Sequence, residues 1–339
     1  MTIKARYIEF SEKGKVAVSS EDVSTEGLKP WEVVVRNESS LVSAGTELSR
    51  LHDVLGNGKY PMRTGYASVG RVVAKGSAVE DFKEGDRVFY AGKHASAQRF
   101  THGQNHQWGR LYPVPEAIAV EDAPFVCLAE IAMTAPCITP LDLGDTVAVF
   151  GLGLVGNLAA QLYQIMGARV IGLDPVKKRC ELARAVGLPV VVDAPPDRQI
   201  QAVKDLTGGR GAEVTVDAVG HSGVIANCVE ATALYGQVAL LGTPRAPHPG
   251  DLTTLLGKIH TNGLVVRGAH MWRFPAAELR EAKQTVPWGY RVMFSFMESG
   301  RLNIAPLRSH FVRPDEAPRM YDGLKNDLEN FWGVVFDWR

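Results

Sequence analysis

The chain has 339 residues, of which 45% are hydrophobic and 22% charged, and this is the composition of a folded protein long enough for two domains. Its 37 basic residues balance 37 acidic ones, so it lacks the broad positive field that binds nucleic acid or an anionic membrane. These values exclude a disordered chain and favour a small-molecule partner.

The start of the chain predicts no targeting segment. Lys4, Arg6 and Glu9 interrupt its apolar residues, so it contains no signal peptide. The most apolar stretch, residues 146–173, carries several glycines and predicts a strand, a turn and a buried helix rather than a membrane span. We therefore expect a cytoplasmic protein with no membrane segment.

The cysteines are widely spaced and form no C-x-x-C pair. A disulfide framework or a clustered structural zinc site is therefore not indicated. The spacing predicts reduced, mostly buried thiols at Cys127, Cys137, Cys180 and Cys228.

The pattern of predicted elements changes along the chain. Residues 1–120 predict short strands separated by turns, with β-rich segments at 33–35, 69–73 and 87–90. From about residue 144, apolar strands alternate with helical segments, which predicts a parallel sheet covered on both faces. These elements are strand 146–150, helix 155–166, strand 169–173, helix 177–186, and strands 190–192, 214–216, 237–241 and 264–267.

The last thirty or so residues return to a β-rich pattern. They predict a strand at 309–312, a helix that begins at Asp315 and a closing strand at 333–337. This ending indicates that the C-terminal segment joins the first, mainly β domain.

A G-x-G-x-x-G motif, Gly151-Leu152-Gly153-Leu154-Val155-Gly156, stands between a predicted strand and a predicted helix. Its first glycine allows a tight turn, its second lets the backbone approach a pyrophosphate, and its third lets helix and strand pack closely. The motif in this context predicts a dinucleotide site, and the alternative is a glycine-rich turn without a ligand.

Asp174 ends the next predicted strand, at close to the roughly 20 residues expected for the acid that accepts hydrogen bonds from the adenosine ribose. A carboxylate there repels a 2′-phosphate. It therefore favours NAD over NADP, although Lys177, Lys178 and Arg179 lie nearby in the sequence.

Three further segments carry a family resemblance. Residues 43–47 (Ser-Ala-Gly-Thr-Glu) are similar to a Cys-Gly-Thr-Asp segment, and residues 65–72 (Gly-Tyr-Ala-Ser-Val-Gly-Arg-Val) to a Gly-His-Glu-x-x-Gly-x-Val segment. Residues 85–88 match a Gly-Asp-Arg-Val segment. With the glycine motif, these segments resemble the medium-chain dehydrogenase/reductase superfamily, the relatives of zinc alcohol dehydrogenase, over nearly the whole chain.

The resemblance implies an α/β fold with two domains. A GroES-like β domain is expected from residues 1–120 and 300–339, and a Rossmann domain with a doubly wound parallel sheet from residues 121–299. The family likeness adds the strand ends near residues 216–220 and 240–243 to the cofactor site. The expected cofactor residues are Gly151, Gly153, Leu154, Val155, Gly156, Asp174, Arg179, Val219, Gly242 and Thr243.

The positions that hold the catalytic metal in zinc members carry Ala44, Tyr66 and Cys127 here. A catalytic zinc needs three protein donors, and alanine offers none while a neutral phenol is a poor one. We therefore expect no metal. The pattern is similar to a narrower branch that includes bacteriochlorophyllide 3-hydroxyethyl dehydrogenases, which implies alcohol and ketone chemistry without identifying the substrate.

Without zinc, another group must donate the proton and stabilise the alkoxide. Tyr66 replaces a histidine ligand and is the first candidate, although its ring can simply fill the vacated volume. Thr46 matches the family's hydroxyl at the substrate oxygen, with a helix cap or turn role as its alternative. Glu47 can accept hydrogen bonds from substrate hydroxyls or form a salt bridge with Arg71.

A polar segment carries three histidines, His94, His102 and His106, together with Trp108. Gly103 within it argues against a helix, so a pair of metal-binding histidines on one helix face is not predicted. We interpret the segment as a lid over a substrate pocket or as surface loop with incidental histidines.

These observations predict a zinc-independent, NAD-dependent oxidoreductase that interconverts a secondary alcohol and a ketone on a sugar, cyclitol or biosynthetic intermediate. The alternatives are an NAD(P)H-dependent enoyl or quinone reductase and a non-catalytic dinucleotide sensor. The apolar edge strand at residues 264–267 predicts pairing across a two-fold axis, as a homodimer or homotetramer.

Overall fold

A computed structural model describes residues 1–103, 109–245 and 248–339. Its contacts divide the chain into two compact units. The first comprises Met1–Cys127, Phe274–Gly300 and Leu307–Arg339. The second comprises Leu128–Arg273 and Arg301–Pro306. Residues 121–127 and 274–299, which were expected in the Rossmann domain, therefore group with the first unit, and residues 301–306, which were expected in the β domain, group with the second.

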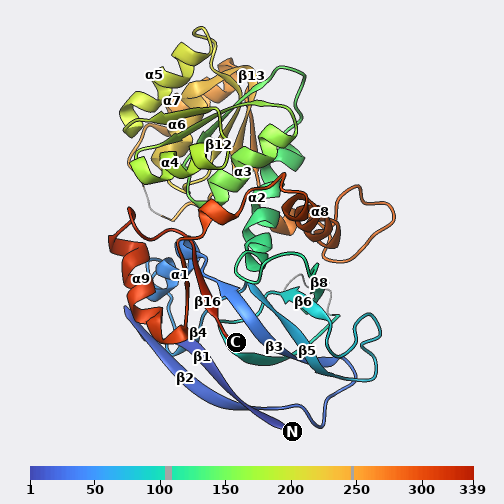
Figure 1. The fold of residues 1–339 in the computed structure, drawn as a ribbon. Helices are drawn as coiled ribbons and strands as arrows, with labels where there is room; N and C mark the ends of the chain where they lie inside the picture. The colour runs from blue at the N-terminus through green and yellow to red at the C-terminus, as the bar shows by residue number, and fades with distance from the viewer. Residues whose placement is uncertain (104–108, 246–247) are drawn as a thin grey trace. The chain divides into compact units, whose positions relative to one another are not determined.

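The first unit contains two antiparallel-rich sheets (Figure 1). In the smaller sheet the strand order is β2-β1-β4, and in the larger it is β15-β16-β3-β5-β6-β8, with β7 also paired to β3. The strands are β1 (Thr2–Glu12), β2 (Lys15–Ser24), β3 (Glu32–Leu41), β4 (Met62–Arg63), β5 (Ser68–Lys75), β6 (Arg87–Tyr90), β7 (Ala97–Thr101), β8 (Tyr112–Pro113), β15 (His310–Val312) and β16 (Val334–Asp337).

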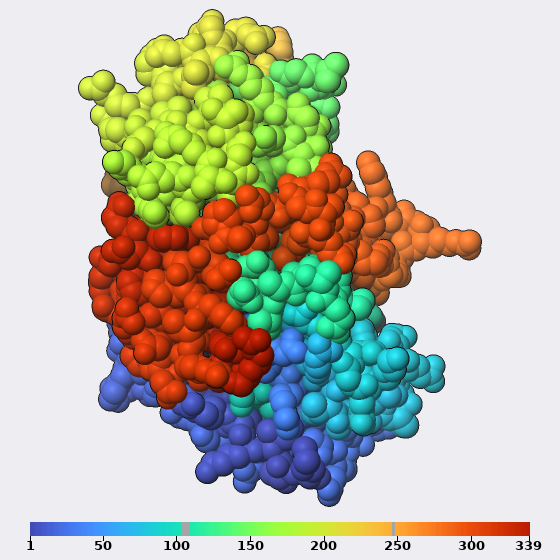
Figure 2. Space-filling view, in the orientation of Figure 1, coloured from blue at the N-terminus to red at the C-terminus, as the bar shows by residue number. Residues whose placement is uncertain are grey.

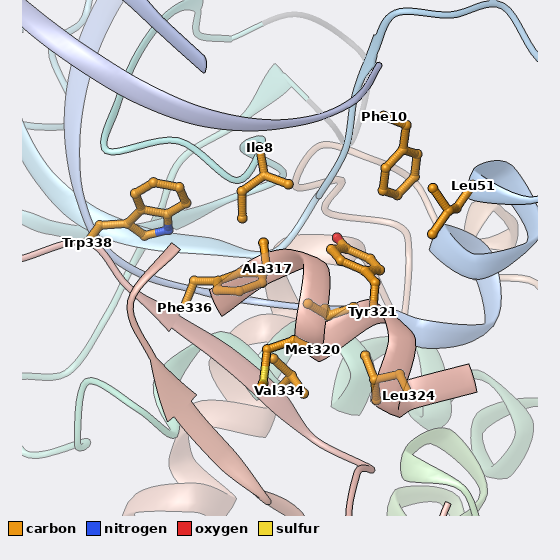
Figure 3. Close-up of a cluster of buried hydrophobic side chains, with 11 residues drawn as sticks. Ile8, Phe10, Leu51, Ala317, Met320, Tyr321, Leu324, Val334, Phe336 and Trp338 are labelled. Atoms are coloured by element: carbon orange, nitrogen blue, oxygen red, sulfur yellow. The ribbon is translucent and has the colours of Figure 1, made fainter. Parts of the chain in front are cut away.

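The two ends of the chain meet in this unit, because β16 pairs with β3. Figure 2 shows the C-terminal segment on the same surface of the unit as the N-terminal strands. The helix α9 (Ala317–Asn326) turns Met320, Tyr321 and Leu324 inward onto Ile8 and Phe10 of β1 (Figure 3). The predicted return of the C-terminal segment to the β domain is thus confirmed, and α9 begins two residues after the predicted Asp315.

An additional helix, α1 (Ala44–Leu51), follows β3 and carries Thr46 and Glu47, in a region where only strands and turns were predicted. Its N-cap is Ser43, whose side chain makes no capping hydrogen bond. Thr46 lies inside the first turn, so the alternative of Thr46 as helix cap is wrong. The unit also contains α8 (Val286–Glu298), which Thr285 caps through a bond from the Trp288 amide.

The second unit has a six-stranded parallel sheet with the order β11-β10-β9-β12-β13-β14 (Figure 1). Parallel strands buried on both faces read as continuous apolar runs, and β9 is buried at every position. The strands are β9 (Thr146–Phe150), β10 (Arg169–Asp174), β11 (Val190–Asp193), β12 (Ala212–Asp217), β13 (Thr232–Leu240) and β14 (Val265–Gly268).

Helices pack against this sheet around a core that includes Phe150, Ile171 and Val238. The predicted α/β fold with a parallel sheet is therefore confirmed. The helices are α2 (Val126–Ile138), α3 (Leu154–Ile165), α4 (Lys177–Ala185), α5 (Pro196–Leu206), α6 (Ser222–Ala231) and α7 (Leu252–Thr261). Within the described residues, 3₁₀ helices are found at Ala123–Phe125, Met271–Arg273, Ala305–Leu307 and Pro314–Glu316.

None of the helices in the described part of the chain is both long and apolar enough to span a bilayer. None of the four cysteines, all of which lie in the described part of the chain, belongs to a disulfide, and Cys127, Cys180 and Cys228 are buried. The prediction of mostly buried thiols is confirmed.

Candidate active site

The glycine motif of the second unit forms the turn between β9 and α3. Gly151 has a φ of +94°, a backbone conformation that side chains larger than glycine rarely adopt. A Cβ at Gly156 would lie 1.9 Å from the carbonyl oxygen of Gly151, so only glycine allows the helix to pack this close to the turn. Both glycines therefore act as the sequence analysis predicted.

Gly153 differs from the other two glycines of the motif, Gly151 and Gly156, because a Cβ at Gly153 would meet no atom within 4 Å. It is the N-cap of α3, and no side chain caps the free backbone amides of the first turn, where Leu154 and Val155 are half-buried. Uncapped amides at a helix N-terminus attract a phosphate group. The open space and the amides together fit the pyrophosphate of a dinucleotide.

Asp174 ends β10 and is almost wholly buried, with 1% of its surface exposed. Its Oδ2 accepts a hydrogen bond from the Leu152 amide at 2.7 Å, and its Oδ1 accepts one from the Val176 amide at 2.8 Å. The Arg179 guanidinium lies 3.5 Å from Oδ2. The carboxylate thus connects the glycine motif to the end of β10 through hydrogen bonds. Its remaining lone pairs can accept a hydrogen bond from a ribose hydroxyl.

The turns after β12 and β13 adjoin the glycine motif. The side chain of Val219 is 49% exposed, and its Cγ2 would lie 2.6 Å from a Cβ at Gly151. A Cβ at Gly242 would lie 2.2 Å from the Gly220 amide nitrogen, so the two turns approach backbone to backbone. The next residue, Thr243, is exposed. The predicted cofactor residues of these turns are therefore brought next to the motif.

In the first unit, three hydroxyl side chains form what we call the hydroxyl cluster: Ser43, Thr46 and Tyr66. The Tyr66 hydroxyl donates a hydrogen bond to Ser43 Oγ and also bonds with the Thr46 side chain. Removal of the phenol from water, with a smaller contribution from Cys127, raises the pKa of Tyr66 to about 12. The phenol therefore keeps its proton at neutral pH. Tyr66 and Thr46 were predicted members of the site, whereas Ser43 is an additional one.

Glu47 lies beneath the hydroxyl cluster with none of its surface exposed. Its carboxylate accepts hydrogen bonds from the Ser43 amide at 2.7 Å and from the hydroxyls of Thr64 and Tyr321, both at 2.5 Å. His94 Nε2 lies 3.1 Å from Glu47 Oε2. Because buried donors surround it, Glu47 helps to hold the first turn of α1, and its carboxylate lies away from the surface, where a substrate hydroxyl was expected to meet it.

Burial alone raises the pKa of Glu47, but the charge and hydrogen bond of His94 and the hydroxyls of Thr64 and Tyr321 outweigh it. The net effect holds the pKa of Glu47 below its ordinary value, so the carboxylate is ionised. His94 Nδ1 in turn lies 2.7 Å from Ser40 Oγ, which accepts the indole N–H of Trp338 at 2.8 Å. A buried polar chain thus runs from Glu47 to Trp338.

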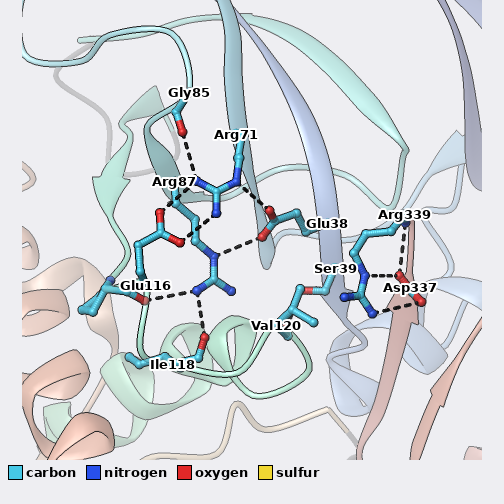
Figure 4. A network of polar contacts seen from close by, with 11 residues as sticks. Glu38, Ser39, Arg71, Gly85, Arg87, Glu116, Ile118, Val120, Asp337 and Arg339 are labelled. Atoms are coloured by element: carbon cyan, nitrogen blue, oxygen red, sulfur yellow. Dashed lines mark hydrogen bonds and ion pairs between the residues drawn. The ribbon is translucent and has the colours of Figure 1, made fainter.

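The predicted salt bridge between Glu47 and Arg71 does not form. Arg71 instead makes a bidentate pair with Glu116, at 2.7 and 2.8 Å, and bonds with Glu38 at 2.9 Å (Figure 4). Arg87 shares the same Glu38 carboxylate at 3.0 Å. The two arginines of this sheet, of which Arg87 is buried and Arg71 partly exposed, therefore form a separate network around Glu38 that does not include Glu47.

The histidine segment also departs from expectation. His94 and His102 are buried, so they are not incidental surface residues. His102 Nδ1 accepts the Leu111 amide at 3.2 Å, which makes it part of the fold. His106 and Trp108 lie outside the described residues.

Thr64 and Tyr321, which bond with Glu47, were not predicted as site residues, because no sequence motif links residues so far from Glu47 in the chain.

The zinc positions of the family do not assemble a ligand set. Ala44 has no donor atom, the Tyr66 phenol is neutral, and Cys127 Sγ lies 3.7 Å from the Tyr66 carbonyl oxygen. Over residues 1–103, 109–245 and 248–339, no group of three or more His, Cys, Asp or Glu side chains is arranged to hold a metal ion. The residues at these positions do not fit a catalytic zinc ion.

Comparison with known proteins places this fold and site in a family. The chain matches an alcohol dehydrogenase GroES-like domain over residues 29–120 and a zinc-binding dehydrogenase domain over residues 155–286. Together the two matches span about two thirds of the chain. The chain belongs to the medium-chain dehydrogenase/reductase superfamily, and it is an oxidoreductase of the alcohol dehydrogenase type.

Individual relatives are distant. An alcohol dehydrogenase of Cupriavidus necator is 25% identical and covers 97% of both chains. A D-guloside 3-dehydrogenase of Escherichia coli is 29% identical over 54% of this chain and 51% of its own. The crystal structure of galactitol-1-phosphate dehydrogenase from Escherichia coli has a TM-score of 0.81 at 20% identity, covering 98% of this chain and 99% of its own. That structural likeness concerns the fold.

Proposed function

We propose that the protein is an NAD-dependent oxidoreductase that interconverts a secondary alcohol and a ketone without a catalytic zinc ion. The observation that carries this proposal is the hydroxyl cluster, whose phenol stands at the position of a metal ligand in zinc relatives. A neutral phenol is a proton donor at neutral pH. The cluster can therefore provide the acid catalysis for which zinc members use the metal.

In the direction of ketone reduction, the carbonyl carbon gains a hydride and the carbonyl oxygen gains a proton. Bound NADH supplies the hydride. Tyr66 gives its hydroxyl proton to the oxygen as negative charge develops there. The hydroxyls of Ser43 and Thr46 rotate to donate to the phenolate that is left, and a proton from water restores the phenol.

The relatives support a polar substrate. Among them are dehydrogenases named for a guloside and for galactitol 1-phosphate, both of which are sugar or polyol derivatives. We infer that this protein also acts on a sugar, a cyclitol or a similar polar small molecule. The Asp174 carboxylate supports NAD rather than NADP, since a 2′-phosphate would approach a buried negative charge.

Replacement of Tyr66 by Phe tests the proposal because it removes only the hydroxyl. We expect kcat to fall about 100-fold, the loss typical of a missing general acid, while the affinity for NADH is unchanged. Tyr90→Phe is the matched control, since that buried phenol bonds with Asn37 Oδ1 outside the hydroxyl cluster. An active enzyme whose rate does not respond to Tyr66→Phe would remove the proposed role.

Metal analysis and fluorescence titration with NADH and NADPH complete the test. We expect metal-free protein to be active and to bind NADH more tightly than NADPH. One stoichiometric zinc ion required for activity would contradict zinc independence. Protein that binds NADH but oxidises no alcohol and reduces no ketone would instead favour a dinucleotide sensor.

A further inference from the structure

Asp217 ends β12 and bonds with both of the turns that adjoin the glycine motif. Its side-chain Oδ1 accepts hydrogen bonds from the backbone amides of Val219 at 2.9 Å and Gly220 at 3.0 Å. Its main-chain carbonyl oxygen accepts the amides of Leu241 at 3.0 Å and Gly242 at 2.7 Å. The side chain therefore holds the turn after β12, and the backbone of the same residue holds the turn after β13.

The two turns are in backbone contact, so the position of one limits the position of the other. Gly220 has a φ of +79°, a conformation that other residues rarely adopt. A Cβ at Gly220 would lie 2.3 Å from the carbonyl oxygen of Thr243. Because Asp217 binds the Gly220 amide, its carboxyl group fixes the backbone at the point where the turns meet.

The carboxyl group of Asp217 is unfavourably placed for stability alone. None of the residue's surface is exposed, and among the described residues its Oδ2 has no hydrogen-bond partner. Burial raises the pKa of Asp217, although the hydrogen bonds from the Gly220 and Val219 amides and the charge of His221 oppose this rise. A buried oxygen without a partner destabilises the folded protein, and such an exception is expected where a side chain arranges a functional site.

The strand order relates these turns to one half of the proposed cofactor. β9 lies between β10, which ends at Asp174, and β12, which ends at Asp217. A dinucleotide whose adenosine ribose binds Asp174 and whose pyrophosphate lies at Gly153 crosses β9 and continues toward β12 and β13. Its nicotinamide half then meets the turns that Asp217 holds.

Val219 gives the turn after β12 an apolar surface. Its side chain is 49% exposed, and its Cγ2 stands next to Gly151 of the glycine motif. An exposed apolar side chain in this position suits the face of a ring. Because the Val219 amide is bonded to Asp217, the carboxyl group helps to fix where this side chain stands.

We propose that Asp217 is a positioning residue for the cofactor, and that it holds the turns after β12 and β13 in the arrangement that receives the nicotinamide half. Asp217 acts through backbone amides and does not itself touch the cofactor. The inference rests on the proposed function, because it concerns the cofactor of that reaction. Binding of the adenosine half, at Asp174 and the glycine motif, does not depend on Asp217.

Calorimetric titration with NADH and with ADP-ribose, which lacks the nicotinamide ring, separates the two halves of the site. Asp217→Ala removes both side-chain hydrogen bonds, so it should weaken NADH binding about tenfold or more and ADP-ribose binding less than about twofold. Asp217→Asn keeps the Oδ1 acceptor and should restore most of the NADH affinity. Asp193→Ala, at the exposed end of β11, is the matched control and should change neither affinity.

Asp217→Ser keeps the test usable if Asp217→Ala does not fold. A serine hydroxyl can accept only part of the hydrogen bonding of the carboxylate, so its NADH affinity should lie between those of the Asn and Ala variants. Equal losses of NADH and ADP-ribose affinity in Asp217→Ser would show a general structural role and overturn the proposal. NADH binding that is unchanged in both Asp217→Ser and Asp217→Ala would overturn it too.

A double-mutant cycle tests whether Asp217 acts through the turn after β12. Val219→Ala removes most of the apolar surface that Asp217 is proposed to position. The variant with both Asp217→Ala and Val219→Ala should therefore bind NADH about as weakly as Asp217→Ala alone. Two independent losses that multiply would contradict this route.

Failure of the proposed function is distinguishable from failure of this inference. Wild-type protein that binds NADH but oxidises no alcohol and reduces no ketone would contradict the proposed reaction, while the binding test of Asp217 would remain decisive. Wild-type protein that does not bind NADH would contradict both.

Discussion

Glu47 shows how one buried side chain can join segments that lie far apart in the chain. Its carboxylate holds the Ser43 amide and the hydroxyls of Thr64 and Tyr321, and it faces His94. These partners come from α1, from the segment before β5 and from α9, which are far apart in the chain. The position of Ser43 and Thr46 therefore depends on an ionised group that lies beneath them.

Glu47→Gln should destabilise the protein by about 3–5 kcal/mol, because it breaks a buried charged pair and presents amide hydrogens to groups that are already donors. Urea unfolding measures this change. Glu21→Gln is the control: it removes an exposed pair with Arg63 and should cost less than about 1 kcal/mol. Equal losses in the two variants would show that the Glu47 network contributes no special stability.

The same network predicts how stability depends on pH. The pKa of Glu47 is lower in the folded protein than its unfolded value of about 4.3, so its contribution is complete above that pH. The contribution is lost as the pH falls through the depressed folded value, because the folded state must then bind the proton. Glu47→Gln should therefore flatten the fall in unfolding free energy below about pH 4.3. A parallel fall in both proteins would contradict this assignment.

At the scale of elements, different glycines of the turn between β9 and α3 contribute to folding and to ligand binding. A methyl group at Gly156 would collide with the Gly151 backbone, whereas one at Gly153 would enter open space. Gly156 is therefore required for the packing of α3 against the turn, whereas Gly153 leaves open the space in front of the α3 backbone amides.

Gly153→Ala should therefore weaken NADH binding about tenfold or more, equivalent to about 1.4 kcal/mol, with little change in unfolding free energy. Gly156→Ala should lose about 1–3 kcal/mol or more of stability as well as NADH affinity. Gly257→Ala, inside α7 with open space around it, should stabilise the protein by about 0.5–1 kcal/mol. Fluorescence titration and thermal unfolding check all three. Unaltered NADH binding in Gly153→Ala would place the pyrophosphate elsewhere.

At the scale of the whole molecule, β14 is an edge strand of the six-stranded sheet, and Val265 and Val266 on it are 41% and 40% exposed. An exposed apolar edge pairs readily with a second copy about a two-fold axis. We expect a dimer that Val266→Lys converts to monomer, as measured by sedimentation. Leu143→Lys, at a fully exposed position in the same unit, should leave the dimer intact. A monomeric wild-type protein would contradict the expectation.

The amino-acid sequence by itself determined the features that are local in the chain. The β9 strand, the glycine motif, α3 and Asp174 follow one another within about thirty residues, so spacing and residue type were enough to predict the turn and its dinucleotide. The replacement of the family's metal ligands by Ala44 and Tyr66 could also be recognised from the sequence, because each residue lies inside a segment that resembles the family.

Only the tertiary structure decided which distant side chains meet. Tyr321 reaches Glu47 across 274 residues, and His94 connects it to Ser40 and Trp338, although no local pattern marks any of these pairs. The short helix α1 was not predicted from the sequence, because the segments around it are β-rich and because tertiary packing rather than helix propensity stabilises it. The same packing buried Glu47 away from Arg71, because contacts between distant segments determine burial and charge pairing.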